Sequence, residues 1–222
     1  MKNSGKILNF IKTLIPLKVP SNISVMYPYR NHYIWSLVEK YYNKYYDDNN
    51  KRILIIGINP GRLGGGITGI PFTDPVNLEK YCFINNTIER KREISSQFIY
   101  EVINKYGGIE KFNNKYFITS TSPFGFVKNG KNYNYYDEKM IVKTWENQII
   151  KWLKIQINIF RISKKVIILG KGKNQNFIEK INNKYKLFDR LITLPHPRWI
   201  MQYKLKEKNY YLDQYLKSLN NF

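Results

Sequence analysis

The residues best suited to bind a ligand or catalyse a reaction lie in one segment in the first third of the chain, from Gly57 to Phe72. This segment combines a single carboxamide, Asn59, with a glycine-rich stretch and one aromatic ring. An amide can hold a water molecule or cap a turn, and glycines let a ligand approach the backbone closely. One polar group and one stacking ring around such a loop suit a flat heterocyclic ligand.

The elements that must position this loop alternate between strands and helices. Four consecutive apolar residues, 53–56, predict a buried strand that ends abruptly at the Gly-Asn-Pro-Gly break. The predicted strands are 52–57, 116–120, 165–170 and 187–194, and the predicted helices are 5–20, 32–46, 94–106, 138–160, 174–183 and 203–219. We therefore expect an α/β protein with a single domain, 1–222, folded as a three-layer α/β/α sandwich around a central four-stranded, mostly parallel sheet.

Each predicted strand ends in a loop rich in Gly, Pro, Ser or Asn. The carboxyl ends of parallel strands meet at one edge of a sheet, so these loops should converge there. The segment 128–136 is the most loop-like stretch of the chain, and its composition is compatible with either a surface loop or a nucleic-acid contact.

Two motifs in a fixed order carry a family resemblance. Residues 57–61 (Gly-Ile-Asn-Pro-Gly) and 68–72 (Thr-Gly-Ile-Pro-Phe) resemble the first active-site motif of the uracil-DNA glycosylase superfamily. Residues 194–199 (Leu-Pro-His-Pro-Arg-Trp) lie where the second motif of that superfamily belongs. The ungapped spacing between Asn59 and Phe72 is most similar to the single-strand-selective monofunctional branch and its bacterial relatives.

The resemblance implies a role for each motif residue. Asn59 would position the water that attacks the sugar, Phe72 would stack on a flipped pyrimidine, and His196 would donate to uracil O2 as negative charge develops there. Arg198 and Trp199 would enter the DNA in place of the extruded nucleotide. The structural alternatives are a turn cap for Asn59, core packing for Phe72, and packing beneath the terminal helix for Trp199.

Other residues of the same loops complete the predicted site. The predicted substrate-binding residues are Gly57, Ile58, Gly61, Gly65, Thr68, Phe72 and Ser120, and the predicted DNA-binding residues are Arg62, Lys171, Lys173, Arg198 and Trp199. The glycines 64–66 lie where the wall beside pyrimidine C5 should be. Without side chains that wall would admit 5-hydroxymethyluracil, although simple loop flexibility explains the glycines equally well.

Two positions depart from the pattern of the family. The second motif commonly reads His-Pro-Ser-Pro-Arg, so His196 falls two positions late when Pro197 and Arg198 are kept in register. Ser120 occupies the position of an asparagine that reads the N3–O4 edge of uracil, and a hydroxyl cannot copy the two bonds of an amide. Ser122 or an asparagine within 128–136 could compensate.

Composition limits the partners and cofactors. The formal net charge of +21 and the pI of about 9.8 favour a polyanionic partner, although the bias of an AT-rich genome toward Lys, Asn, Ile and Tyr also makes proteins basic. A single cysteine, Cys82, excludes an internal disulfide and a four-cysteine iron–sulfur cluster. Two distant histidines, His32 and His196, argue against a zinc site, so we expect neither a metal nor an organic cofactor.

The chain has no apolar run of membrane-spanning length, and its first residues lack the pattern of a signal peptide. We therefore expect a monomer in the bacterial cytoplasm.

The predicted function is that of a monofunctional glycosylase that flips uracil out of single- or double-stranded DNA and leaves an abasic site for base excision repair. A non-catalytic binder of damaged or single-stranded nucleic acid on the same fold is the alternative. A phosphate-cradling nucleotide-binding domain fits less well, because the Gly-Lys-Ser/Thr and Gly-x-Gly-x-x-Gly patterns are both missing.

Overall fold

A parallel four-stranded sheet forms the centre of the computed structural model, which describes residues 1–160 and 165–221. The strand order is β3-β2-β6-β7, and every neighbouring pair is parallel. All residues of β2 are buried, as expected for a central strand covered on both faces. The strands are β2 (Ile53–Gly57), β3 (Tyr116–Ser120), β6 (Lys165–Leu169) and β7 (Arg190–Leu194).

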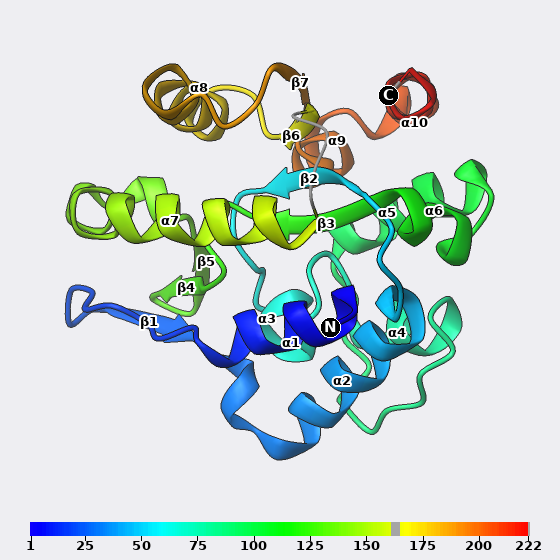
Figure 1. Ribbon diagram of the computed structural model, residues 1–222, viewed down its shortest axis with the longest axis horizontal. Helices are drawn as coiled ribbons and strands as arrows, with labels where there is room; N and C mark the ends of the chain where they lie inside the picture. The colour runs from blue at the N-terminus through cyan, green and yellow to red at the C-terminus, as the bar shows by residue number, and fades with distance from the viewer. Residues whose placement is uncertain (161–164, 222) are drawn as a thin grey trace.

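Helices cover both faces of this sheet (Figure 1). Helices α7 and α8 lie on one face, at the left of the view, and α5, α6 and α10 lie on the other. The α/β/α sandwich predicted from the sequence is therefore confirmed. These helices are α5 (Ile94–Tyr106), α6 (Ile109–Lys115), α7 (Lys139–Phe160), α8 (Lys173–Tyr185) and α10 (Lys208–Asn220).

Shorter elements surround the sandwich. Helices α1 and α2 pack on each other beyond the β3 edge of the sheet, at the bottom of Figure 1. Helix α2 begins as predicted, because the Asn31 side chain accepts hydrogen bonds from the backbone N–H groups of Tyr33 and Ile34. The remaining helices are α1 (Asn3–Lys12), α2 (His32–Tyr46), α3 (Gly65–Thr68), α4 (Pro75–Lys80) and α9 (Pro197–Tyr203), with 3-10 turns η1 (Pro28–Arg30), η2 (Tyr135–Asp137) and η3 (Leu205–Glu207).

A second, antiparallel sheet corrects the prediction of a loop over 128–136. It has the order β1-β4-β5, formed by β1 (Ile23–Met26), β4 (Gly125–Lys128) and β5 (Lys131–Tyr133). The hairpin between β4 and β5 turns at Asn129 and Gly130, which both have positive φ, +50° and +69°. Asn-Gly is the preferred pair for this tight turn, so the sequence did carry its signal.

Two helix boundaries were also predicted wrongly. The helix predicted over 5–20 spans only Asn3–Lys12, because the residue before Pro16 is disfavoured in the helical region and the chain leaves the helix earlier. The segment predicted as one helix over 203–219 begins with the end of α9 and continues through η3 into α10. Helix α9 falls where a loop was expected, with Pro197 at its first position, where a missing N–H costs nothing.

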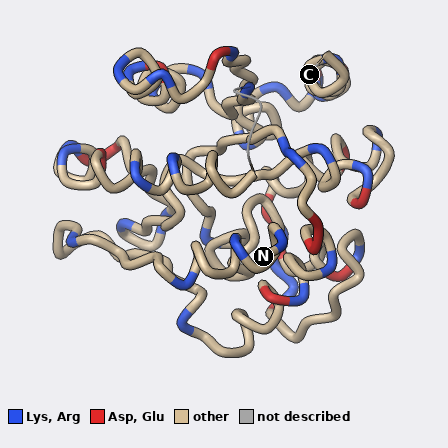
Figure 2. The backbone as a smooth tube through the Cα atoms, in the orientation of Figure 1, with Lys and Arg blue, Asp and Glu red and all other residues tan. Residues whose placement is uncertain are grey.

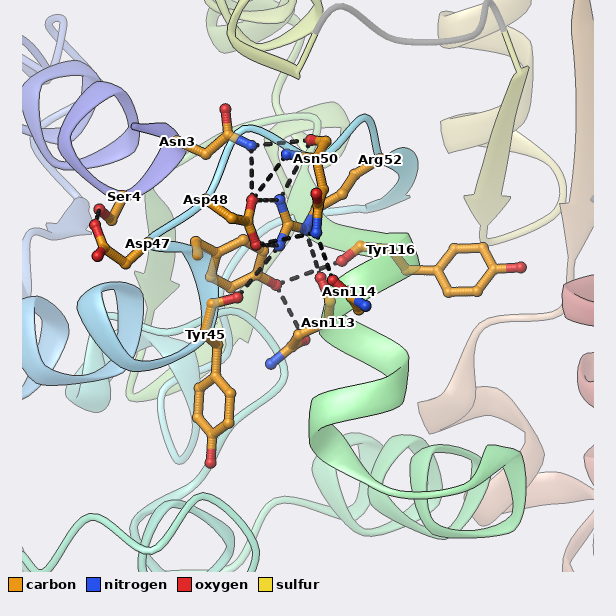
Figure 3. A network of polar contacts seen from close by, with 11 residues as sticks. Asn3, Ser4, Tyr45, Asp47, Asp48, Asn50, Arg52, Asn113, Asn114 and Tyr116 are labelled. Carbon is orange, nitrogen blue, oxygen red and sulfur yellow. Dashed lines mark hydrogen bonds and ion pairs between the residues drawn. The ribbon is translucent and has the colours of Figure 1, made fainter. Parts of the chain in front are cut away.

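A buried arginine fixes the start of β2 (Figure 3). Both terminal nitrogens of Arg52 donate to the carboxylate of Asp48, at 2.8 and 2.7 Å, and its Nε donates to the carbonyl of Asn113. The guanidinium also lies over the Tyr46 ring, 4.5 Å from the ring centroid. These contacts join the end of α2, the start of β2 and the end of α6. The hydrogen bond from Arg52 also holds the pKa of Asp48 below its usual range.

Candidate active site

A cleft of about 680 Å³ opens at the carboxyl edge of the parallel sheet. Its walls come from the loops after β2, β6 and β7, from β5 and the turn that follows it, and from α9 and α10. The register of the sheet brings these loops level, since Gly57 pairs with Ser120 and Leu169 pairs with Leu194. The predicted site residues that line the cleft are Ile58, Asn59, Gly61, Lys171, His196, Arg198 and Trp199. Asn59 and His196, at opposite ends of the sequence, therefore share one cavity.

The side chain of Asn59 is held in one orientation by the backbone. Its Oδ1 accepts a hydrogen bond from the N–H of Tyr135 at 3.1 Å. Its Nδ2 donates to the carbonyls of Tyr133 and Pro60, each at 3.3 Å. Asn59 thus does tie its loop to the chain after β5, as the turn-cap alternative requires. An amide oxygen has two lone pairs, so one of them is still available to a water molecule in the cleft.

Phe72 is not among the residues that line the cleft, but its ring contacts His196, which does, and its backbone conformation is uncommon. Its φ of +52° is rare for a bulky residue and costs roughly 1–3 kcal/mol. The ring packs so closely on Gly57 that a Cβ there would lie 2.6 Å from Phe72 Cε2. It also meets the His196 ring, with centroids 5.6 Å apart and planes inclined by 38°. The strained backbone thus holds the ring between the end of β2 and the second motif.

His196 is fixed in one tautomer by the helix that follows it. It is the N-cap of α9, where its Nδ1 accepts a hydrogen bond from the backbone N–H of Arg198 at 3.1 Å. A backbone N–H can only donate, so Nδ1 carries no proton and the neutral ring carries it on Nε2. Burial, with a smaller contribution from the charge of Arg198, lowers the pKa of His196 to about 4. The imidazole is therefore a neutral N–H donor at physiological pH.

Several predicted substrate-binding residues lie away from the cleft. Thr68 is fully buried, and its hydroxyl donates to the carbonyl of Thr73 at 2.7 Å. Gly65 and Ser120 line a separate cavity of about 30 Å³, with Pro60 contributing to the walls of both cavities. Ser122, considered as a substitute for the missing asparagine, is buried and donates to the carbonyl of Phe124.

Asparagines after the β4–β5 turn do reach the cleft. Asn132 and Asn134 both line it. Asn134 donates to Asp137 at 2.9 Å. The Oδ1 of Asn132 accepts from the backbone N–H of Arg62 at 2.9 Å, and within the described ranges its Nδ2 has no hydrogen-bond partner. Asn132 therefore brings a free amide donor to the β5 side of the cleft.

Glu93 is a cleft residue that the sequence analysis missed. It lies between the glycine-rich loop and α5, and a Cβ on Gly61 or Gly64 would come within 1.9 Å of its carboxylate oxygens. Burial and the nearby Asp74 raise the pKa of Glu93 to about 7, while Arg198 opposes this shift. Among the described residues the carboxyl group has no hydrogen-bond or ion-pair partner. Nothing in the sequence marks it, because it is one acidic residue in the charged run 89–93.

A buried amide joins the strand ends behind the cleft. The Oδ1 of Asn174 accepts hydrogen bonds from Thr121 Oγ1 at 2.9 Å and from the Tyr135 hydroxyl at 3.0 Å. Its Nδ2 donates to the carbonyl of Leu169 at 3.2 Å. Tyr135 in turn supplies the N–H that holds Asn59, so Asn174 supports the predicted catalytic amide through Tyr135.

The predicted DNA-binding residues are exposed, but they are not equivalent. Arg198 and Trp199 begin α9 at the mouth of the cleft, and Lys171 lies on the opposite loop. Lys173 lies outside the cleft, 3.4 Å from the carboxylate of Asp137. Figure 2 shows basic residues on elements throughout the molecule, so the net charge is not confined to the cleft.

The fold and the two motifs define the class of this protein. The family model of the Uracil DNA glycosylase superfamily matches residues 43–220, and the chain belongs to that superfamily. Among solved structures it is similar to the crystal structure of wild-type Pedobacter heparinus SMUG2, with a TM-score of 0.94, 43% sequence identity, and coverage of 100% of both chains. No curated protein matches the chain. The resemblance recognised from the two motifs is confirmed, and it supports a DNA glycosylase type of function.

Within the described residues, no helix is long and apolar enough to cross a membrane. In the same residues, no group of three or more His, Cys, Asp or Glu side chains is arranged to hold a metal ion.

Proposed function

We propose that this protein hydrolyses the N-glycosidic bond of uracil in DNA and leaves an abasic site. The observation that carries this proposal is the tautomer of His196. A neutral donor that faces the cavity can stabilise the negative charge that develops on uracil O2 as the bond to the sugar breaks. The hydrogen bond from Arg198 N–H to Nδ1 keeps the proton on Nε2, so this donor needs no rearrangement before the reaction.

Asn59 would supply the attacking water. An amide is a poor base, so it would orient the water through the second lone pair of Oδ1 rather than remove a proton from it. Departure of the base would then lead the reaction, which agrees with a strong donor at His196. The three backbone contacts of Asn59 favour this role, because a rigid amide holds a water in one place.

The flipped base would stack on Phe72, and its polar edge would be read from the β5 side of the cleft. Asn132 has the free amide donor for this contact, in place of the asparagine that Ser120 replaces. We include 5-hydroxymethyluracil as a second substrate to test. The carboxyl group of Glu93 lies beside Gly61 and Gly64 and would offer a hydrogen-bond partner to a hydroxymethyl group on C5.

The direct test uses a labelled oligonucleotide with one uracil, as single strand and as duplex. The protein is incubated with each substrate, and the products are separated with and without hot alkali. We expect strand breaks only after alkali, because the proposed nucleophile is a water molecule rather than a lysine amine, and the abasic site should stay intact until base cleaves it. A thymine oligonucleotide controls for selectivity, and a mock purification from cells that lack this protein controls for a contaminating glycosylase.

The same experiment separates the enzyme from the alternative of a non-catalytic binder. A binder would shift the uracil oligonucleotide in a gel while producing no alkali-labile site at any protein concentration. That outcome would overturn the proposed reaction. Alkali-labile sites produced equally by wild type and by the Asn59→Ala variant would reject the role of Asn59.

A further inference from the structure

Exposed aromatic rings line the wall of the cleft formed by α9 and α10. Tyr203, at the end of α9, is 71% exposed, and Tyr210, in the first turn of α10, is 59% exposed. Both line the same cavity as Asn59 and His196. A single exposed ring is common on a protein surface, but several exposed rings that line one cavity are typical of a binding site.

The packing of α10 fixes which of its residues face the cleft. Leu212, Tyr215 and Leu219 are buried, and Tyr215 anchors the helix by donating from its hydroxyl to the carbonyl of Pro195. Tyr210 and Gln214, four residues apart on another face, therefore point toward the cavity that they line.

Neighbouring rings stiffen this wall. Tyr211 meets Tyr210 edge to face, with centroids 5.3 Å apart, and meets Trp199 in the same manner at 5.9 Å. In an edge-to-face contact only one ring offers its face to the other. The rings are thus held by one another while faces are left for a ligand.

The charges around this wall favour an anionic ligand. Lys204 and Lys208 are already paired, with Glu207 and Glu101 respectively, each at 2.8 Å. Lys206 is exposed and, like Arg198, has no ion-pair partner within the described ranges. Flat rings beside free cations are the combination that binds unpaired nucleotides, in which bases stack and phosphates are neutralised.

We propose that Tyr203 and Tyr210 form a stacking platform for the bases of unpaired nucleotides on one side of the nucleotide held at Asn59 and His196. This inference rests on the proposed function for the position of the central nucleotide. The platform would take bases of any sequence, because every base has a π-face, and it would make single-stranded DNA a better ligand than DNA whose flanking bases are paired.

The test removes the rings and the bases separately. Binding is measured for single-stranded oligonucleotides that carry one central uracil, flanked either by normal nucleotides or, on one side at a time, by abasic tetrahydrofuran nucleotides that keep the phosphates. The proteins are wild type, the double variant Tyr203→Ala/Tyr210→Ala, and the double variant Tyr203→Phe/Tyr210→Phe, all at one salt concentration. Phe83→Ala is the control, since Phe83 is also 71% exposed but lies outside the cleft.

Wild type should lose about tenfold or more in affinity when the flanking bases on one side are removed. On the normal oligonucleotide, the double alanine variant should bind more weakly than wild type by a similar factor. On the oligonucleotide whose flanking bases are removed on that side, the variant and wild type should bind almost equally. The phenylalanine variant and Phe83→Ala should behave as wild type, because stacking needs the ring and not the hydroxyl group.

Equal losses for the alanine variant on normal and abasic oligonucleotides would overturn the proposal, as would wild-type affinity in that variant. A loss of affinity in the phenylalanine variant would show that the hydroxyl groups, and not the rings, contact the DNA. A dimer of the wild type that dissociates in the alanine variant would mean that the rings cover a second copy of the chain. The wild type could also fail to excise uracil while the ring and base removals still give the binding losses expected above. That result would reject the proposed reaction and leave the platform.

Discussion

Replacing His196 by asparagine should separate two roles that one imidazole performs. Nδ1 caps α9 by accepting from Arg198 N–H, and the ring, which carries its proton on Nε2, lines the cleft. Asparagine is among the strongest N-cap residues, so His196→Asn keeps the cap, but its amide ends short of the position of Nε2. Alanine at this position removes both the cap and the donor, and it serves as the matched comparison.

The expected magnitudes differ for rate and stability. Loss of a preorganised donor to a developing anion costs roughly 10²–10³-fold in rate, about 2.7–4 kcal/mol of transition-state stabilisation. Loss of an N-cap costs about 1 kcal/mol, which lowers the Tm of a protein of this size by about 2–4 °C. We therefore expect His196→Asn to lose excision rate at an unchanged Tm, and His196→Ala to lose both.

The assay is single-turnover excision on a uracil oligonucleotide at saturating protein, from about pH 5 to about pH 8, with thermal unfolding measured in parallel. Since the pKa of His196 is about 4, its titration should not appear in the wild-type rate across this range. The lowered pKa also means that stability from the neutral ring is present above about pH 6.5 and is lost as pH falls through about 4. A wild-type rate in His196→Asn, or a rate titration near pH 6.5 that the variant abolishes, would refute the neutral-donor role.

Three further predictions follow from other parts of the structure. The pKa of Glu93 is raised to about 7. The stability that its protonated form contributes is therefore present below about pH 4.5 and lost as pH rises through about 7. Glu93→Gln should resist urea better than wild type at about pH 8 and no better at about pH 4. Arg52→Met should lower the free energy of unfolding by about 1–3 kcal/mol, because the buried carbonyl of Asn113 loses its donor, whereas the exposed neighbour change Lys51→Met should alter urea unfolding little. In Arg198→Ala and Trp199→Ala, excision should fall more on duplex than on single-stranded substrate, because a wedge acts where a base must leave a stack; equal losses on both would leave Trp199 as a packing residue.

The sequence predicted the parallel sheet well, because its signals are local. The apolar run 53–56 and the break at Asn59 identify β2 without reference to the rest of the chain, and α5 has a glycine pair at its end. The antiparallel sheet was missed because its strands have only three or four residues and because β1 pairs with β4 at a separation of 99 to 105 positions. Its turn was nevertheless encoded in Asn129-Gly130.

The site was predictable where a residue belongs to a motif and unpredictable where tertiary packing creates the environment. Asn59 and His196 were identified from motif positions, and they line one cleft. Glu93 looks like any other acidic residue in a charged run, and only the approach of the glycine-rich loop buries its carboxyl group. Thr68 shows the reverse case, because its place in the motif suggested a ligand contact while its hydroxyl bonds within the loop.

The displacement of His196 by two positions has a structural resolution. A histidine two positions earlier would precede Pro195 and could not cap α9. At position 196 the same residue both begins the helix and meets the Phe72 ring. The cap fixes the tautomer, and burial keeps the ring neutral, so the chemistry expected of the motif depends on the helix that the sequence analysis did not predict. The altered motif and α9 are therefore one feature, in which Pro197 starts the helix and His196 gains the hydrogen bond that keeps its remaining proton on Nε2.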